Sequence, residues 1–244
     1  MIAARLYTHH SRVITVLLSL VLLLLWFPGC GEDQEDVEDD TRFEPEDTTA
    51  VVPAAGPTGP PAPTRPQSMG GKIRIEGDST EVRFRLVDDA VLPFSTYVPD
   101  GIIQGERIAH DGGTGARFFA NFAGKLSQDA YLNIFFPARD TTFDLLRKSV
   151  AGDSTGLIYQ MGLKLDKSTT AAKFCPWAKE SFSFSGPNDG KNVKGTLCLG
   201  THRGRAFYVL VHYPAEYAGG FPPRVERILN EIRWDDTGRP LEKE

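Results

Sequence analysis

Apolar and charged residues alternate in two segments near the end of the first third of the chain. Residues 72–76 and 80–87 both show this period of two. Successive side chains of a β-strand point to opposite faces of a sheet, so the spacing predicts two half-buried strands. Val82, Phe84 and Leu86 are then expected to face the interior.

Further segments rich in β-branched and aromatic residues follow, separated by turns that contain glycine, proline, asparagine or aspartate. Such segments are typical of strands. The clearest is a hairpin over 193–213, whose arms are joined by a turn at 201–204. The other segments expected to be strands are 92–99, 102–110, 116–123, 131–136, 157–165 and a short one containing Phe182 and Phe184.

The period changes to that of a helix at two places. After residue 140, apolar residues recur three and four positions apart, which predicts a helix capped by Asp140 or Thr141 and ended by Gly152. A second helix is expected to begin at Pro222 or Pro223, because proline suits the first helical turn. The two apolar stripes are Phe143, Leu146 and Val150, and Val225, Ile228, Leu229 and Ile232, with Trp234 closing the core.

Strands outnumber helices in this pattern, and the two do not alternate regularly. The sequence therefore predicts one α+β globular domain over residues 69–236, with a mostly antiparallel sheet packed by helices.

Three signatures of this domain occur in a fixed order. They are Phe-Ser-Thr-Tyr-Val-Pro-Asp-Gly at 94–101, Tyr-Leu-Asn-Ile-Phe-Phe-Pro at 131–137 followed by a helix, and a final strand at 203–214 followed by a helix ending Ile-Leu-Asn-Glu-Ile-Arg-Trp at 228–234. Together they resemble the PsbP-like fold, an antiparallel sheet sandwiched by helices that small bacterial envelope lipoproteins share. The resemblance implies protein binding or complex assembly. It carries no catalytic residue and no cofactor.

The first thirty residues indicate where in the cell the protein is located. Arg5 and Arg12 precede an apolar run of 15 residues over 13–27, and the small residue Gly29 follows. A membrane-spanning helix needs about 20 residues, whereas the apolar part of a signal peptide reaches about 15. We therefore expect residues 1–29 to be a signal peptide.

Gly29 and Cys30 resemble the end of a bacterial lipobox, in which a peptidase cuts before a cysteine that carries lipid. Phe27 and Pro28 depart from the usual pattern. The resemblance implies an envelope lipoprotein that is anchored through lipid, palmitate included, on Cys30 to the extracytoplasmic side of a bacterial membrane. An uncleaved anchor and an ordinary signal peptide are the alternatives.

Residues 30–68 are expected to form a disordered tether. Ten of residues 31–48 are acidic and six of residues 50–68 are proline. Neither stretch can bury enough apolar surface to offset the entropy of ordering it. The formal net charge of −5 arises here, because basic and acidic residues are nearly balanced from Met69 onward. That balance argues against nucleic acid as a partner. Residues 237–244 are expected to be a flexible tail.

Cys175 and Cys198 remain as a pair once Cys30 carries lipid. Paired cysteines oxidise outside the cytoplasm, so we expect a disulfide between them. Two separate buried thiols are the alternative. No Cys-x-x-Cys motif or Cys/His cluster accompanies the pair, so the sequence predicts no metal site.

The densest polar cluster of the domain is the hairpin turn with His202, Arg203 and Arg205. We expect these residues to contact a protein partner or an anionic lipid headgroup. A hairpin turn needs polar residues in any case, so a structural role is the alternative. The aromatic residues that precede the first helix suit either core packing or a ligand cavity; they are Phe118, Phe119, Phe122, Tyr131, Phe135 and Phe136.

Gly152, Ser154 and Gly156 match the Gly-x-Ser-x-Gly pattern of serine hydrolases. That chemistry needs a strand before the serine, a helix after it and a histidine within hydrogen-bond reach. The predicted elements here come in the inverted order, so we expect no catalytic residue. The sequence favours a non-enzymatic, membrane-tethered binding or assembly module for a protein or a small apolar ligand. A small secreted serine hydrolase is the alternative.

Overall fold

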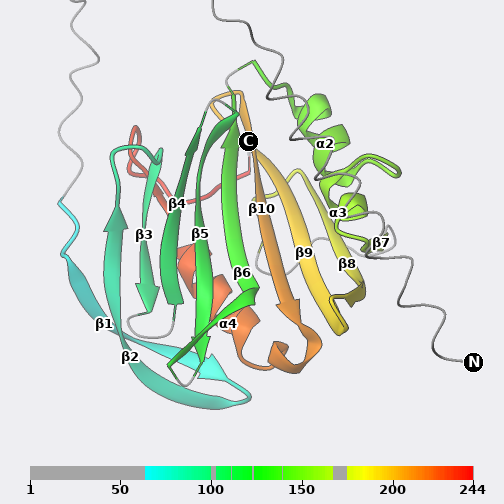
Figure 1. Ribbon diagram of the computed structural model, residues 1–244. Helices are drawn as coiled ribbons and strands as arrows, with labels where there is room; N and C mark the ends of the chain where they lie inside the picture. Colours follow the sequence, from blue (N-terminus) through cyan, green and yellow to red (C-terminus); the bar gives the residue numbers. More distant parts are fainter. Residues whose placement is uncertain are drawn as a thin grey trace, which may run out of the picture. The chain divides into compact units, whose positions relative to one another are not determined.

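The computed structural model describes residues 64–99, 103–110, 112–122, 124–138, 140–166 and 175–243 (Figure 1). The expected signal peptide, Cys30 and the acidic part of the expected tether lie outside these ranges. Among the residues described, no helix is long and apolar enough to cross a membrane. The elements are β1 (Ser68–Ile75), β2 (Asp78–Asp88), β3 (Phe94–Pro99), β4 (Ile103–His110), β5 (Gly113–Phe122), β6 (Lys125–Pro137), α2 (Phe143–Ala151), α3 (Leu157–Gln160), β7 (Lys164–Asp166), β8 (Glu180–Asn188), β9 (Lys191–His202), β10 (Arg205–Pro214), the 3-10 turn η1 (Ala215–Tyr217), α4 (Phe221–Asn230) and β11 (Arg233–Trp234).

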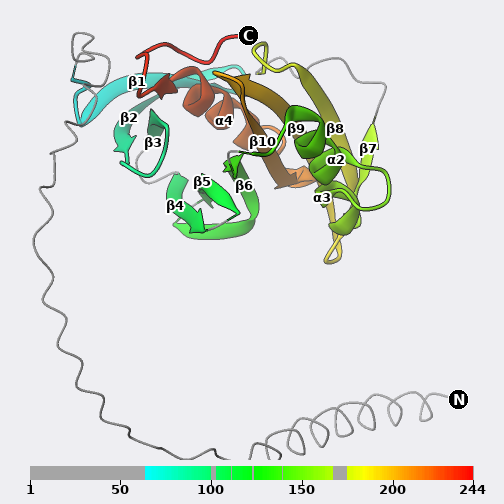
Figure 2. The ribbon, with the colours of Figure 1, turned by 90° about the horizontal axis from the view of Figure 1, so that it is seen from above.

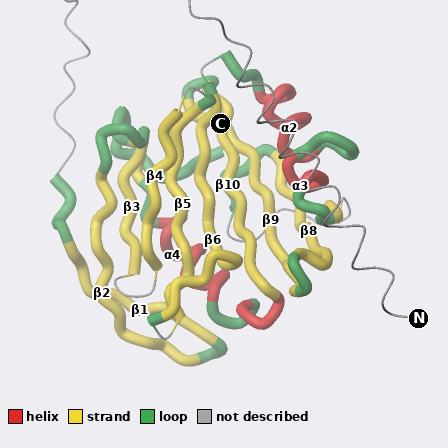
Figure 3. The backbone as a smooth tube through the Cα atoms, in the orientation of Figure 1, coloured by secondary structure: helices red, strands yellow, loops and turns green. Residues whose placement is uncertain are grey.

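The strands form two antiparallel sheets (Figure 3). The smaller sheet has the order β1-β2-β3-β11, and the larger has the order β4-β5-β6-β10-β9-β8-β7. The predicted hairpin over 193–213 is confirmed as β9 and β10, which pair from Arg205 opposite His202. Its two-residue turn has positive φ at Arg203 (49°) and Gly204 (75°), which is the conformation that joins twisted antiparallel strands without splaying them.

The larger sheet has an apolar core on each face. On β10, Phe207, Val209 and Val211 point to an inner core shared with α4 and the smaller sheet. The alternate residues, including Ala206 and Leu210, point to a second core under α2 and α3. Figure 2 shows α4 and the α2–α3 pair on opposite sides of β9 and β10.

Both predicted amphipathic helices are confirmed. In α2 the N-cap is Thr142 and not the predicted Asp140 or Thr141, and its hydroxyl accepts a hydrogen bond from the Leu145 amide. Leu146 and Val150 are buried as predicted, whereas Phe143 is half-buried. In α4, prolines stand in the first turn and the predicted apolar stripe is buried. The Thr96 hydroxyl donates a 2.6 Å hydrogen bond to the Ile228 carbonyl and so joins the helix to β3.

The segment 157–165 is not one strand. It forms the short helix α3, followed by the three-residue strand β7. A short apolar run suits a buried helical turn as well as a strand, and here packing against α2 decides between them.

The expectation of a helix-packed α+β domain is wrong: the domain is β-rich, with two sheets and few helices. The helices α2, α3 and α4 are nine, four and ten residues long, whereas β6 and β9 reach 13 and 12. Helices of that size cover only part of either face, so side chains from the sheets supply most of the core. The arrangement implied by the PsbP-like resemblance is therefore corrected.

Residues expected to belong to the tether and the tail contact the domain. Arg65 donates hydrogen bonds of 2.9 Å to the Ser95 hydroxyl and to the Glu231 carbonyl. At the other end, the Trp234 amide donates a 2.9 Å hydrogen bond to the Arg239 carbonyl, and Leu241 packs against the inner core.

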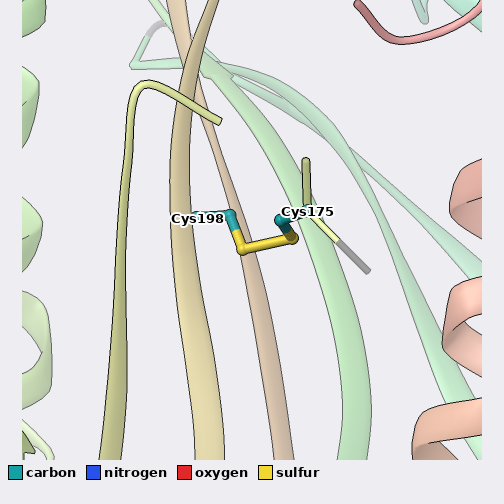
Figure 4. Close-up of a disulfide and its surroundings, with 2 residues drawn as sticks. All are labelled: Cys175 and Cys198. Atoms are coloured by element: carbon teal, nitrogen blue, oxygen red, sulfur yellow. A yellow bond between two sulfur atoms is a disulfide. The ribbon is translucent and has the colours of Figure 1, made fainter. Parts of the chain in front are cut away.

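The predicted disulfide between Cys175 and Cys198 is confirmed (Figure 4). It ties the segment that precedes β8 to the inner face of β9, with a Cα–Cα distance of 6.5 Å. Both cysteines are fully buried, and nearby Trp177 stacks on Phe207 with ring centres 5.3 Å apart.

Candidate ligand-binding face

The predicted partner-binding residues of the β9–β10 turn bind other residues of their own domain. The His202 ring stacks on Trp234, with ring centres 3.9 Å apart, and its Nε2 lies 3.0 Å from both carboxylate oxygens of Asp236. Arg203 Nε lies 3.1 Å from the same carboxylate. Asp236 therefore provides a counter-charge within the domain to two of the residues that made this turn prominent in the sequence.

Arg205 is also engaged within the domain. It donates a 3.2 Å hydrogen bond to the Pro137 carbonyl, and its guanidinium carbon lies 5.4 Å from the centre of the Phe136 ring. A cleft of about 550 Å³ opens beside the turn. It is lined by His202, Arg203, Trp234, Thr237, Arg239, Pro240, Glu242 and Lys243.

Ser154 lies exposed in the turn between α2 and α3. The three histidines of the described ranges have partners elsewhere. His110 Nδ1 accepts a hydrogen bond from the Gly112 amide, His202 binds Asp236, and His212 binds the Asp129 carbonyl.

A second cluster, which we call the aromatic face, adjoins the core under α2 and α3: Tyr208 belongs to that core, and Tyr131 and Phe135 pack against it. Strand register places its members, together with Leu210 and Gly115, in three rows across β5, β6 and β10: Phe119–Tyr131–His212, then Arg117–Asn133–Leu210, then Gly115–Phe135–Tyr208. The main strand contacts of α2 are with β9 and β10, and those of α3 are with β7. The aromatic face consists of Arg117, Phe119, Tyr131, Asn133, Phe135, Tyr208 and His212.

Two glycines allow rings to lie flat against the sheet here. A Cβ atom on Gly115 would come within 2.3 Å of the Ile134 carbonyl and 3.1 Å of the Phe135 ring. A Cβ atom on Gly195, which is paired with His212, would collide with the Phe184 ring. The glycines therefore let Phe135 and Phe184 cover the strands at the two ends of the face.

The rings of the face contact one another in sequence. Phe119 meets Tyr131 edge-on with ring centres 6.3 Å apart, and Tyr131 stacks on His212 at 4.8 Å. Phe135 lies 5.5 Å from Tyr208. Phe119, Tyr208 and His212 are buried, whereas Tyr131 and Phe135 are half-buried, so these two rings reach the surface.

An irregularity in β6 determines which ring nitrogen of His212 carries the proton. The β5–β6 register shifts after Phe119, and the residues that loop out bring the Asp129 carbonyl 2.7 Å from His212 Nδ1. A carbonyl only accepts, so Nδ1 carries the proton and Nε2 is left as an acceptor. Burial lowers the pKa of His212, and this effect outweighs the attraction of Asp129. The imidazole is therefore neutral at pH 7.

Polar groups of the face lack partners among the described residues. Arg117 Nε, Asn133 Oδ1 and His212 Nε2 are buried atoms with no hydrogen bond. Asn133 Nδ2 does donate a 3.2 Å hydrogen bond to the Tyr208 hydroxyl. Burial raises the pKa of Tyr208 to about 12, so its hydroxyl stays protonated. Native structures leave few buried polar atoms unpaired, so three in one cluster mark a place where polar ligand groups fit.

The sequence contained a signal for this face, which the interpretation of all these aromatic residues as core residues missed. Phe118 and Phe136 are core residues, but Phe119, Tyr131 and Phe135 alternate with them and point to the other side. Arg117 and Asn133 interrupt these aromatic strands at positions that face the same way. A cation and an amide on an aromatic sheet face are unusual in a core and favour the ligand alternative.

Comparisons with protein-family models, with curated proteins and with solved structures found no match to this chain.

Proposed function

We propose that this chain is a lipid-tethered, non-enzymatic binding module of a bacterial cell envelope, and that its aromatic face binds a small ring-bearing ligand. The observation that supports binding is the combination of two half-buried rings, Tyr131 and Phe135, with Arg117 and with polar atoms that lack partners. Ligand sites typically combine aromatic walls with a few polar groups that fix orientation. The His202–Arg203 turn is less suited, because Asp236 already binds both side chains.

The size of the face favours a small molecule over a protein. Three strands spaced about 4.8 Å apart, and three rows spaced about 6.8 Å apart, give a patch of roughly 10 by 14 Å. Each partner in a standard protein complex buries about 800 Å², several times that area. A bicyclic ring system matches the patch.

The proposed location in the cell envelope rests on the N-terminal sequence and on the cysteines. The basic start, the apolar run over 13–27 and Gly29–Cys30 support lipidation of Cys30. The disulfide between Cys175 and Cys198 is the state favoured by an oxidising compartment.

Binding is tested with 2-naphthamide, a neutral bicyclic probe. The full chain in phosphatidylcholine nanodiscs is dialysed to equilibrium against the probe, and empty nanodiscs correct for partitioning into lipid. A probe of about 13 non-hydrogen atoms at about −0.3 kcal/mol each is expected to bind with a Kd in the millimolar range or tighter.

Variants locate the binding. Tyr131→Ala and Phe135→Ala are each expected to weaken binding at least several-fold, because each removes a ring wall. Tyr159→Ala is the matched control, since Tyr159 is an aromatic residue on α3 that is 56% exposed. Absence of binding, or equal binding by all three variants, would contradict a ligand site on the aromatic face.

Lipidation is tested by mass spectrometry of the chain recovered from membranes. The expected N-terminus is Cys30 carrying diacylglycerol, and Cys30→Ala is expected to abolish the modification. An unmodified chain that begins at Met1 would rule the proposed anchor out.

A further inference from the structure

We infer that one face of the β1–β2 hairpin docks on an anionic phospholipid surface. Directly paired residues of antiparallel strands point to the same side of a sheet. Four such pairs, all exposed, make up this face: Ser68–Arg85, Gly70–Arg83, Lys72–Glu81 and Arg74–Ser79. Four of these residues are cations and one is an anion. We call the four cations, Lys72, Arg74, Arg83 and Arg85, the basic stripe.

The opposite face of the hairpin explains why the stripe is exposed. Ile73 and Phe84 alternate with the cations and are buried in a small core with Tyr97 of β3. β1 and β2 form a ribbon at one side of the domain (Figure 1). A sheet face in solvent needs polar residues but not an excess of one sign, so the excess of cations favours an anionic partner.

Two cations of the stripe have uncharged neighbours across the strands. Arg74 is paired with Ser79 and lies on the edge strand β1. Arg85 is paired with Ser68 on one side and with Val98 on the other. All of these neighbours belong to the part of the chain that the structure describes, so the register itself shows that no acidic residue faces either arginine directly.

Lys72 is only weakly engaged. Its Nζ lies 3.5 Å from Glu81, and the two side chains are 64% and 83% exposed. Ion pairs this exposed contribute little to stability, so an outside anion can replace Glu81. Arg83 has other contacts, so the cations available to a partner are Lys72, Arg74 and Arg85.

The dimensions of the stripe favour a surface over a single small anion. It runs from residue 68 to residue 74 along β1, roughly 20 Å at about 3.4 Å per residue. A hollow of about 570 Å³ lies within it, lined in part by Ser68, Gly70 and Lys72. A Cβ atom on Gly70 would meet nothing within 4 Å, so the space above this glycine is open. A headgroup phosphate fits there while its acyl chains stay in the bilayer.

The place of the stripe in the chain supports a bilayer as the partner. Residues 31–67 separate Cys30 from β1, and a flexible chain of that length spans roughly 30–35 Å on average. The inference rests on the proposed lipid anchor for this proximity. Each Lys or Arg close to an anionic membrane strengthens attachment roughly fivefold.

The test measures how fast N-hydroxysuccinimidyl acetate acetylates Lys72 in the full chain, by peptide mass spectrometry. One set of nanodiscs is phosphatidylcholine, and the other is an equal mixture with phosphatidylglycerol. We expect acetylation of Lys72 to be at least several-fold slower in the mixed nanodiscs, and high salt should restore its rate. Lys164 is the internal control, because it is exposed on β7 at the other side of the domain, and its rate should be equal in both (Figure 2).

Charge-matched variants assign the protection to the stripe. The Arg74→Gln, Arg85→Gln double variant should lower the ratio of docked to undocked domains roughly 25-fold, at about fivefold per cation, and so remove most of the protection of Lys72. The Arg147→Gln, Lys148→Gln double variant loses the same charge from exposed positions on α2 and should behave as wild type. Circular dichroism verifies that each variant is folded.

The outcomes distinguish this inference from the proposed function. Equal rates for Lys72 in the two kinds of nanodisc, in a chain whose lipidated Cys30 and 2-naphthamide binding are verified, would overturn the docking inference alone. Protection that survives in the Arg74→Gln, Arg85→Gln variant would also overturn it. Salt-sensitive protection already present in phosphatidylcholine would instead assign the stripe to the acidic residues of 31–48, and protection by added inorganic phosphate would assign it to a soluble anion.

Discussion

The two faces of the larger sheet are built from alternate residues of the same strands, yet they differ in character. On β6, Ile134 and Phe136 point to α4 and are 1% exposed. Their neighbours Tyr131, Asn133 and Phe135 point the other way, and the two rings are only half-buried. The inner face is covered by a helix and a disulfide, whereas part of the outer face presents half-buried aromatic rings next to Arg117.

This difference separates residues that stabilise the fold from residues available for binding. Inner-face side chains are mostly enclosed by apolar partners, and Phe136 alone contacts the rings of Phe94, Phe207 and Trp234. Trp177 Nε1 is a buried polar atom of this core without a hydrogen bond among the described residues. On the outer face Arg117, Asn133 and His212 keep buried polar atoms that have no hydrogen-bond partner in the part of the chain that the structure describes. Groups left unsatisfied in a stable fold are typical of sites kept for function at some expense of stability.

The largest expected effect on stability comes from replacing, one at a time, two neighbouring phenylalanines of β6 that point to opposite faces. Phe136→Ala should lower the free energy of unfolding by about 3–5 kcal/mol, since it opens a cavity in the inner core. Phe135→Ala removes the same side chain from a half-buried position and should cost only roughly 1–2 kcal/mol. Urea unfolding followed by circular dichroism measures both.

Binding should respond in the reverse order. Under conditions where both variants are folded, Phe136→Ala should retain affinity for naphthyl probes, and Phe135→Ala should lose it. If both substitutions cost the same stability, or if Phe136→Ala alone loses binding, then the faces are not divided in this way.

The disulfide provides a second, smaller test of the inner face. Cys175 and Cys198 are 23 residues apart, and on the chain-entropy model a bridge of that span stabilises the fold by roughly 3 kcal/mol. The Cys175→Ala, Cys198→Ala double variant should lose about that much in a urea titration. Its affinity for 2-naphthamide at low urea should stay at the wild-type value, and a loss of affinity there would mean that the inner face shapes the site.

Local pattern was enough to predict most elements of the fold but not its class. Alternation in 80–87 and the turn at Arg203–Gly204 are local signals, and both led to the correct strands. The class depends on how far helices extend over a sheet, which is a tertiary property. Residues 157–165 show the same limit, because packing against α2 selects a helix over a strand there.

The candidate site was harder to predict, because charge density along the chain says nothing about pairing across it. His202 and Arg203 stood out in sequence, yet Asp236, more than thirty residues away, binds both. Arg117 looked ordinary because its surroundings come from β4, β6 and β10. Whether a cation has a partner becomes visible only once the strands are in register.

The smallest expected effect is a pH dependence of the free energy of unfolding that originates in His212 of the outer face. Burial holds the pKa of His212 below its ordinary value of 6.5, so below about pH 6.5 the unfolded chain binds a proton that the folded chain does not. Stability should therefore fall as pH drops through this region. His212→Gln should remove that slope in urea titrations between pH 5 and 7.5.

Asp235, which follows β11, makes stability change with pH in the opposite direction, so its contribution has to be removed first. Burial, with the charges of Asp88 and Asp236, raises the pKa of Asp235 to about 6 from an ordinary 3.8. Between those values the folded chain keeps a proton that the unfolded chain has lost, so stability falls as pH rises through the window. The Asp235 carboxylate is only partly desolvated and the residue is exposed by its surface area, so solvent screening should limit this effect to less than about 1 kcal/mol. The effect of His212→Gln is therefore measured in a chain that already carries Asp235→Asn. There it should remove the remaining fall in the free energy of unfolding as pH drops from 7.5 to 5. A slope that persists in the double variant would place the titrating group outside the aromatic face.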